Sequence, residues 1–191
     1  MGGPRKDRSD VRSVIAVVGA ECSGKSTLAE ALGRTLPAVV VPEHLREFVE
    51  VHGRPPTRGE QASIMAAQIA AEERARATAA PPALVVSDAG ALMTAVYSML
   101  YFEDASLLGA AIEHHRRAYV LTVWCDVDLP WIEDGAQRDG EEFRRRGHDI
   151  LAGVLKGAPF DLVMASGGLD DRVRVVTRAI AMRAARASLP P

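Results

Sequence analysis

The chain has 191 residues, of which 48 % are apolar and 25 % are charged, and its formal net charge at pH 7 is −2. These values predict one folded domain, and they exclude a disordered chain and a nucleic-acid binder that works through overall positive charge. No apolar run reaches the length of a membrane span, and the two cysteines, Cys22 and Cys125, show neither a pairing nor a metal-ligand pattern.

We therefore expect a protein of a reducing cytoplasm. Arginine far outnumbers lysine, which favours a bacterial source. Residues 1–12 are rich in glycine and charge, so we expect them to form a flexible tail. Residues 13–191 are expected to form a single domain.

Apolar, valine-rich runs of strand length alternate with helical segments along the whole chain. The expected strands are 14–18, 38–41, 84–86, 119–124 and 161–165. The expected helices are 26–36, 45–51, 57–77 (with Thr57 and Glu60 spaced as a capping box), 89–100, 105–117, 141–155 and 170–187. Nearly continuous apolar strands predict a parallel sheet that is covered on both faces. The fold class is therefore α/β, with three layers and about five parallel strands, and its ligands bind at the carboxyl ends of the strands.

The first strand leads into Gly19-Ala20-Glu21-Cys22-Ser23-Gly24-Lys25-Ser26-Thr27. This segment matches G-x-x-x-x-G-K-[ST], the phosphate-binding loop of P-loop NTPases, and it has the strand before and the helix after that the motif requires. The whole segment is expected to bind ATP through backbone N–H groups and the positive end of the helix dipole. Lys25 is expected to reach the β- and γ-phosphates, and Ser26 to ligate Mg²⁺.

Asp88 follows the apolar run of the third strand. A carboxylate after such a run is the Walker B pattern, in which it holds Mg²⁺ directly or through water. The same aspartate at a strand end is also a common helix cap.

Glu43 stands at the end of the second strand. A carboxylate there is placed to accept the proton of an attacking hydroxyl, or to orient that hydroxyl. The alternative is a glutamate favoured by the dipole of the following helix. Arg46 lies one helical turn on, so it either pairs with Glu43 or binds substrate or phosphate.

The segment after the fourth strand predicts a mobile lid around residues 129–150. Trp131 offers a flat face for a ring, particularly a cationic one, although a tryptophan is also a common core residue. Arg144, Arg145 and Arg146 either supply charge to the phosphates or form a solvated helix face. After the last strand, Gly167 is expected to lie beside the adenine.

Four pieces of the chain together resemble the NadR-type nicotinamide riboside kinases and the P-loop ATPase domains grouped with them. They are the P-loop with glutamate at its third position, Glu43 with Arg46-Glu47-Phe48, Ser87-Asp88 with Thr94, and Pro130-Trp131-Ile132-Glu133-Asp134-Gly135. The resemblance covers about residues 13–168. The chain departs from the family at Val86, where family members often carry an additional aspartate. It also departs at Arg138, which stands one position later than the corresponding arginine of the family.

The resemblance implies an enzyme that uses ATP and Mg²⁺ to phosphorylate the ribosyl 5′-hydroxyl of nicotinamide riboside. It implies that Lys25, Glu43, Asp88 and Arg138 carry the chemistry, and that Glu43, Arg46, Asp88, Trp131 and Asp134 bind the riboside.

The residues leave two other functions open: a kinase for another nucleoside or metabolite, and a non-catalytic ATP-binding regulatory module. A GTPase switch is excluded because its guanine reader needs asparagine, which the chain lacks. An AAA-type motor is also disfavoured, because its Walker B motif needs a second acidic residue at the position that Ala89 occupies. We expect a small-molecule partner and neither nucleic acid nor membrane, while the oligomeric state stays open.

Overall fold

The computed structural model describes residues 14–78, 84–131 and 140–187. The expected tail, 1–12, lies outside the described residues, as does the centre of the expected lid, 132–139. Among the described helices, none is both long and apolar enough to cross a membrane.

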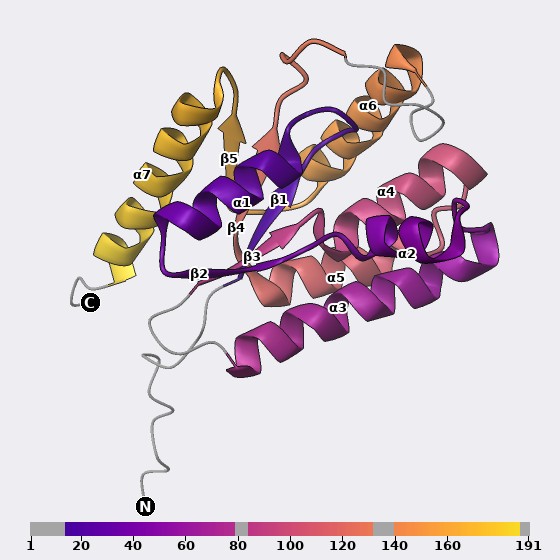
Figure 1. Ribbon diagram of the computed structural model, residues 1–191, viewed down its shortest axis with the longest axis horizontal. Coiled ribbons are helices and arrows are strands. Elements are labelled where there is room, and N and C mark those ends of the chain that lie inside the picture. The colour runs from indigo at the N-terminus through magenta and orange to yellow at the C-terminus, as the bar shows by residue number, and fades with distance from the viewer. Residues whose placement is uncertain (1–13, 79–83, 132–139, 188–191) are drawn as a thin grey trace, which may run out of the picture.

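A five-stranded, wholly parallel sheet forms the centre of the molecule (Figure 1). Its strands are β1 (Val14–Val18), β2 (Ala38–Val41), β3 (Leu84–Asp88), β4 (Tyr119–Cys125) and β5 (Leu162–Ala165), in the spatial order β2-β3-β1-β4-β5. The predicted fold class is thus confirmed. β3 runs farther than predicted because Ser87 and Asp88, although polar, continue the ladder opposite Ala16 and Val17.

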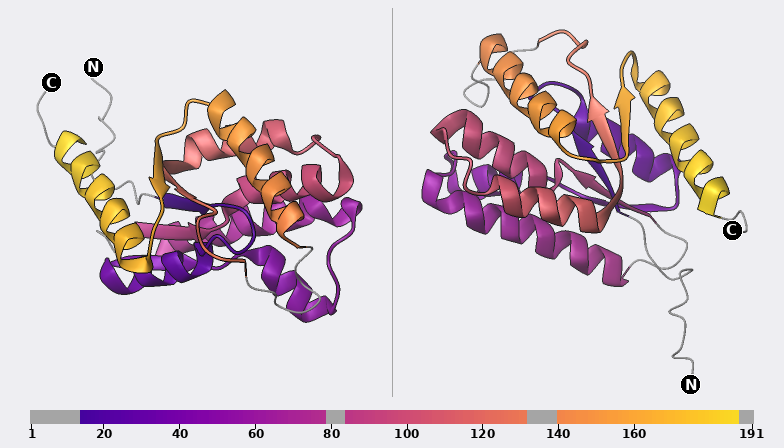
Figure 2. Two further views of the ribbon diagram at one scale, coloured as in Figure 1. Left: turned by 90° about the horizontal axis from the view of Figure 1, so that it is seen from above. Right: turned by 180° about the vertical axis from the view of Figure 1, so that it is seen from behind.

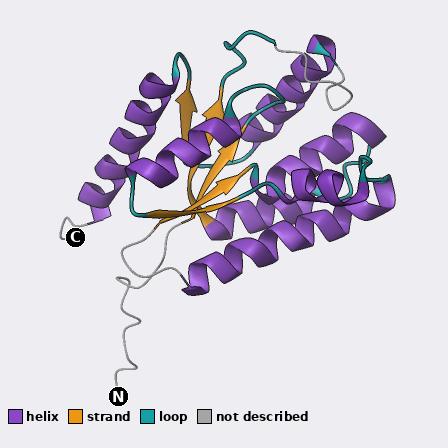
Figure 3. Cartoon of the chain, viewed as in Figure 1, coloured by secondary structure: helices purple, strands orange, loops and turns teal. Residues whose placement is uncertain are grey.

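Helices cover both faces of the sheet (Figures 2 and 3). They are α1 (Lys25–Thr35), α2 (His44–His52), the 3₁₀ turn η2 (Arg58–Glu60), α3 (Gln61–Thr78), α4 (Gly90–Phe102), α5 (Leu108–Ala118), α6 (Glu141–Gly157) and α7 (Leu169–Ala187). Alternate residues of β1 face opposite layers. Ile15 and Val17 pack in the cluster of α1 and α7, whereas Ala16 and Val18 pack in the cluster of α4 and α6.

The predicted capping box is present at the start of η2. The backbone N–H of Thr57 donates to Glu60 Oε2 at 2.7 Å and its hydroxyl donates to the same oxygen at 2.8 Å. Arg54 also pairs with Glu60, and these bonds hold the pKa of the Glu60 carboxyl well below its usual value. One continuous helix was predicted from residue 57; the structure instead has a single 3₁₀ turn that passes into α3.

Candidate active site

Two glycines shape the loop between β1 and α1. A Cβ on Gly19 would lie 2.5 Å from Ser23 Oγ and 3.0 Å from the carbonyl oxygen of Cys125, so only glycine allows this close approach of the loop and the end of β4. Gly24 has φ 79°, a left-handed conformation that turns the chain into α1. The sequence therefore folds locally into the tight cradle that a phosphate-binding loop needs.

Lys25 is held over this loop. Its Nζ donates to the carbonyl of Ala20 at 3.0 Å, and the hydroxyl of Ser23 donates to the same carbonyl at 2.7 Å. Ser26 lies half-buried in the first turn of α1, whereas Thr27 is exposed. The arrangement places an ammonium group and a hydroxyl beside the positive end of a helix dipole, where a polyphosphate binds.

Asp88 lies at the carboxyl end of β3, opposite Val17 of β1. It is buried, and its Oδ1 makes no hydrogen bond to any of the described residues. The N-cap of α4 is Ala89, at φ 69°, and Asp88 makes no capping bond to that helix. Asp88 therefore does not act as the helix cap that its position also allowed, and its carboxylate remains available to a ligand.

Glu43 occupies the N-cap of α2 and likewise makes no side-chain cap bond. Burial raises the pKa of its carboxyl above the ordinary value; nearby Asp88 and Glu21 raise it further, while Lys25 and Arg46 act against the shift. Because β2 pairs with β3 and β3 pairs with β1, the P-loop, the end of β2 and the end of β3 lie side by side at one edge of the sheet.

Aromatic side chains of α4 face this acidic cluster. The hydroxyl of Tyr101 donates to Glu21 Oε1 at 2.9 Å, and its ring stacks on Phe143 of α6 with centroids 5.7 Å apart. Tyr97 is buried, and burial together with the charges of Glu43 and Glu21 raises the pKa of its phenol well above 10. Tyr97 therefore stays neutral and presents an uncharged wall to the cluster.

Ser26 and Asp88 fit a bound Mg²⁺. Magnesium in P-loop sites is held by a hydroxyl, by one carboxylate directly or through water, and by phosphate oxygens and water, so a cage of protein carboxylates is not required. The described residues contain no group of three or more His, Cys, Asp or Glu that would form such a cage. The buried Asp88 Oδ1 that lacks a hydrogen bond is the kind of acceptor that such a site needs.

An arginine that sequence reasoning missed joins three loops of the site. Arg172, at the start of α7, is buried; it donates to the carbonyl of Ser23 at 2.7 Å and to that of Gly167 at 2.9 Å. It also forms an ion pair with Asp128, which accepts the backbone N–H of Gly167. Arg172 thus links Gly167 to the P-loop, and the role of Gly167 beside the adenine stays a prediction.

The expected lid residues fall into separate groups. Trp131 is half-buried at the edge of the described segment, while Asp134 and Arg138 lie outside the described residues. Arg144 is buried and donates to the carbonyl of Leu129 at 2.7 Å, so it fastens α6 to the chain before the lid. Arg145 and Arg146 lie exposed on α6.

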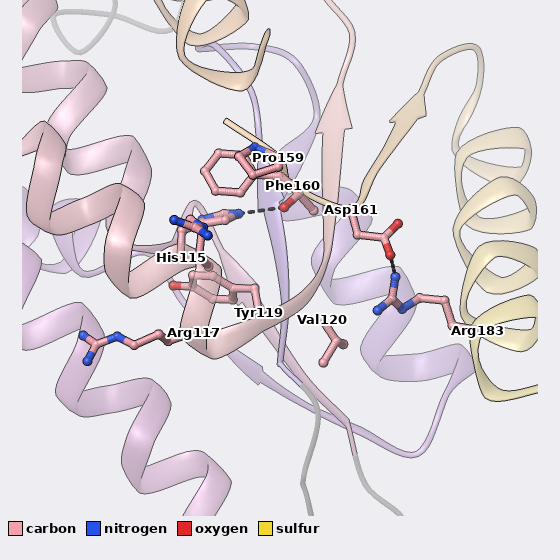
Figure 4. Close-up of a pocket in the computed structure, with 10 residues that line it drawn as sticks. His115, Arg117, Tyr119, Val120, Pro159, Phe160, Asp161 and Arg183 are labelled. Carbon is pink, nitrogen blue, oxygen red and sulfur yellow. Dashed lines mark hydrogen bonds and ion pairs between the residues drawn. The ribbon is translucent and has the colours of Figure 1, made fainter. Parts of the chain in front are cut away.

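A pocket of about 430 Å³ lies at the opposite end of the sheet (Figure 4). It is lined by the first residues of β4 and the residues before β5, and Asp161 pairs there with Arg183. Burial lowers the pKa of His115 to about 3, and its Nε2 lies 2.6 Å from Thr122 Oγ1. This neutral imidazole is far in the fold from the P-loop, and none of the predicted site residues lines the pocket.

The loop geometry and the strand order define a P-loop nucleotide-binding domain. The chain belongs to the family described as AAA domain, which matches residues 14–172. No curated protein matches the sequence.

Solved structures share the fold. The NadR protein in complex with NR is 22 % identical over 90 % of this chain, with a TM-score of 0.72. A deoxyadenosine kinase from M. mycoides is 11 % identical over 88 % of this chain, with a TM-score of 0.64, and a thymidylate kinase from Ehrlichia chaffeensis is 17 % identical over 90 %, with a TM-score of 0.66.

The coverage of these proteins differs. The chain spans about half of the NadR chain (50 %), but 99 % of each of the two kinase chains. The family match confirms the resemblance to the P-loop ATPase domains, and the solved structures confirm the fold that the chain shares with NadR and the nucleoside and nucleotide kinases.

Proposed function

We propose that the protein is an ATP-dependent phosphotransferase of the cytoplasm that phosphorylates a hydroxyl group of a small molecule. The observation that supports this proposal is the strand register, which brings the P-loop with Lys25, the end of β3 with Asp88 and the end of β2 before Glu43 to one edge of the sheet. A binding module needs the lysine and the P-loop, but it has no use for a half-buried carboxylate of raised pKa beside them.

Each residue has a distinct part in the transfer. Lys25 neutralises charge on the β- and γ-phosphates, and Ser26 with Asp88 would hold Mg²⁺, which would supply further positive charge to the phosphates. Glu43 accepts the proton of the acceptor hydroxyl as the new P–O bond forms and ADP leaves. Burial raises the pKa of Glu43, which makes its ionised carboxylate a better proton acceptor.

The acceptor that the site suits best is nicotinamide riboside, phosphorylated on its 5′-hydroxyl. Its ring is cationic, and the site combines the carboxylates of Glu21, Glu43 and Asp88 with the rings of Tyr97 and Tyr101. Negative charge and aromatic faces both favour a cation. The four sequence motifs that resemble the NadR-type kinases support the same acceptor, with Trp131 and Asp134 as further contacts in the lid, around residues 129–150.

A deoxynucleoside is the second candidate, because the chain spans the full length of the deoxyadenosine kinase that it resembles in fold. A screen of purified protein with ATP and Mg²⁺ against nicotinamide riboside, the common nucleosides and the deoxynucleosides tests both. Transfer to the riboside alone supports the first acceptor, and transfer to a deoxynucleoside supports the second. ATP binding without transfer to any hydroxyl would indicate a regulatory module. Asp88→Asn should weaken the dependence on Mg²⁺ in whichever reaction is found.

A further inference from the structure

A buried carboxylate behind the candidate active site has no part in the chemistry described above. Glu72 lies in the middle of α3 with 2 % of its surface exposed. It accepts the hydroxyl of Ser87 at 2.5 Å and the hydroxyl of Tyr119 at 2.8 Å. A carboxylate can be buried in this way only if its lone pairs are satisfied, and two hydroxyl donors from β3 and β4 do so here.

One branch of this network leads to Glu43. Gln68, one turn before Glu72 on α3, donates to Ser87 Oγ at 3.1 Å, and its side-chain oxygen accepts the backbone N–H of His44 at 2.8 Å. That N–H belongs to the first turn of α2, where a side chain at the N-cap ordinarily accepts it or a neighbour. Gln68 therefore fixes, from another helix, the backbone position directly after Glu43.

A second branch leads to Asp88. Ser87 precedes it on β3, and Ala89 follows it with φ 69°, which is an unfavourable conformation for a residue with a Cβ. The backbone N–H of Ala91 donates to Tyr119 Oη at 3.3 Å, so the hydroxyl that bonds Glu72 also anchors the first turn of α4. Both sides of the strained corner that carries Asp88 are therefore tied to Glu72.

Other charges near Glu72 are few among the described residues. The imidazole Nε2 of His114, from α5, lies 3.4 Å from Glu72 Oε2 and is the cationic group that pairs with it when protonated. Gln68 Nε2 lies 3.5 Å from Glu72 Oε1, at the limit of a hydrogen bond. The carboxylate is thus surrounded by donors from α3, β3, α5 and β4.

We propose that Glu72 is a positioning residue for phosphoryl transfer, which sets Glu43 through Gln68 and Asp88 through Ser87 and Tyr119. This inference rests on the proposed function, because it assigns the two strand-end carboxylates to the acceptor and to Mg²⁺. One buried group then fixes the relative placement of the proton acceptor and the metal-binding carboxylate. Groups that orient a metal ligand from behind typically change metal affinity about 10- to 100-fold when they are lost.

Three substitutions separate the branches. Ser87→Ala removes the link toward Asp88, Gln68→Met removes the cap of α2, and Glu72→Gln weakens both because an amide nitrogen cannot accept the hydroxyl hydrogens. Thr122→Val is the matched control: Thr122 is equally buried at 2 % exposed, and it also takes part in a buried hydrogen bond, to His115 at 2.6 Å, but it lies on β4, which β1 separates from β3.

The first readout needs no acceptor. Calorimetry of ATP binding over a series of Mg²⁺ concentrations should show the half-saturating Mg²⁺ concentration raised roughly tenfold in Glu72→Gln and Ser87→Ala, and unchanged in Gln68→Met and Thr122→Val. Loss of folded molecules alone lowers the amplitude of binding without moving this midpoint. An unchanged midpoint in Ser87→Ala would overturn the proposal, even if Glu72→Gln does not fold.

The second readout uses whichever acceptor the wild-type protein phosphorylates. Gln68→Met should raise the acceptor KM and lower kcat several-fold while the KM for ATP stays within a factor of two, whereas Thr122→Val should change none of these constants. Equal behaviour of the two variants would show that the network is purely structural. If the wild-type protein phosphorylates no acceptor, the proposed function fails, and the calorimetry alone still decides the placement of Asp88 by Glu72.

Discussion

Arg172 of α7 and Asp128 of the loop after β4 form an ion pair whose arginine is 2 % exposed and whose aspartate is 32 % exposed. The same guanidinium bonds the carbonyl of Ser23 in the P-loop. The side chain of Arg172 therefore joins three segments through its hydrogen bonds: the P-loop, the segment that precedes the lid and the loop after β5.

We expect Arg172→Met to lower both the stability and the affinity for ATP. Removing the guanidinium leaves the carbonyls of Ser23 and Gly167 without this donor, and an unsatisfied buried acceptor costs about 1–3 kcal/mol of the free energy of unfolding. Urea denaturation and calorimetry with ATP measure the two effects. Arg174→Met is the matched control, because Arg174 pairs with Asp171 on the exposed face of the same helix, and its loss should cost less than about 1 kcal/mol. Equal losses in both variants would contradict this role of Arg172.

Lys25→Ala should lower the rate of phosphoryl transfer by about 10²- to 10³-fold or more, because the phosphates lose a preorganised positive charge during the reaction. The fold should persist, which circular dichroism and thermal unfolding would show. Lys156→Ala, at the exposed end of α6, changes the same residue type away from the site and should leave the rate unchanged. A Lys25→Ala protein of near wild-type turnover would remove the P-loop from the mechanism.

The proposed role of Glu43 as general base predicts that activity falls on the acid side of the pH–rate profile. A general base must be ionised, so kcat should fall as the pH drops through the pKa of Glu43, which burial raises above its ordinary value. Glu43→Gln should lower kcat at saturating ATP and abolish that acid limb. Glu47→Gln removes an exposed carboxylate of the same helix and should keep the limb. If Glu43→Gln keeps the wild-type profile, another group accepts the proton.

Trp131→Ala should raise the KM for nicotinamide riboside about tenfold, since a desolvated cation–π contact contributes on the order of 1–2 kcal/mol. The KM for ATP should change much less, and Trp131→Phe should restore part of the riboside affinity. Steady-state kinetics with both substrates varied gives the comparison. An equal loss for both substrates would identify Trp131 as a structural tryptophan.

The lowered pKa of His115 predicts that the folded protein loses stability in acid. Its pKa of about 3 in the folded protein lies below the ordinary 6.5 because burial disfavours the imidazolium. Between these two values the unfolded chain binds a proton that the folded protein does not, so the free energy of unfolding falls by about 1.4 kcal/mol for each pH unit downward. In urea titrations from pH 7 to pH 4, His115→Phe should show a smaller decline than the wild type. Parallel declines would mean that His115 does not limit acid stability.

The strands and the residues at their carboxyl ends could be predicted because their signals are local. A run such as Leu84–Val86 specifies a buried strand by composition alone, and topology then makes Asp88 and the P-loop neighbours. The network of Gln68 and Glu72 was missed because it depends on contacts between helices and strands far apart in the sequence. One signal was present: Gln61, Ile64, Gln68, Glu72 and Ala75 form the buried stripe of α3, and three of these five residues are polar.

Arg172 was missed for a related reason. It stands in Leu169-Asp170-Asp171-Arg172, which reads as an acidic first turn with an ordinary surface arginine. Only the fold shows that its side chain is buried against Ser23 and Gly167. Arg144 gives the same lesson, because it belongs to a run of three arginines of which it alone is buried.

The cap that Gln68 places on α2 gives this helix a pivot. The bond is made to the backbone of His44, at the very start of the helix, and no residue of α2 is fully buried. Nine residues of α-helix extend about 13 Å, so a small rotation about the first turn moves the distal end near His52 much farther than it moves Glu43. Gln68 therefore fixes this helix at the end next to Glu43, where any displacement of the outer end moves the carboxylate least.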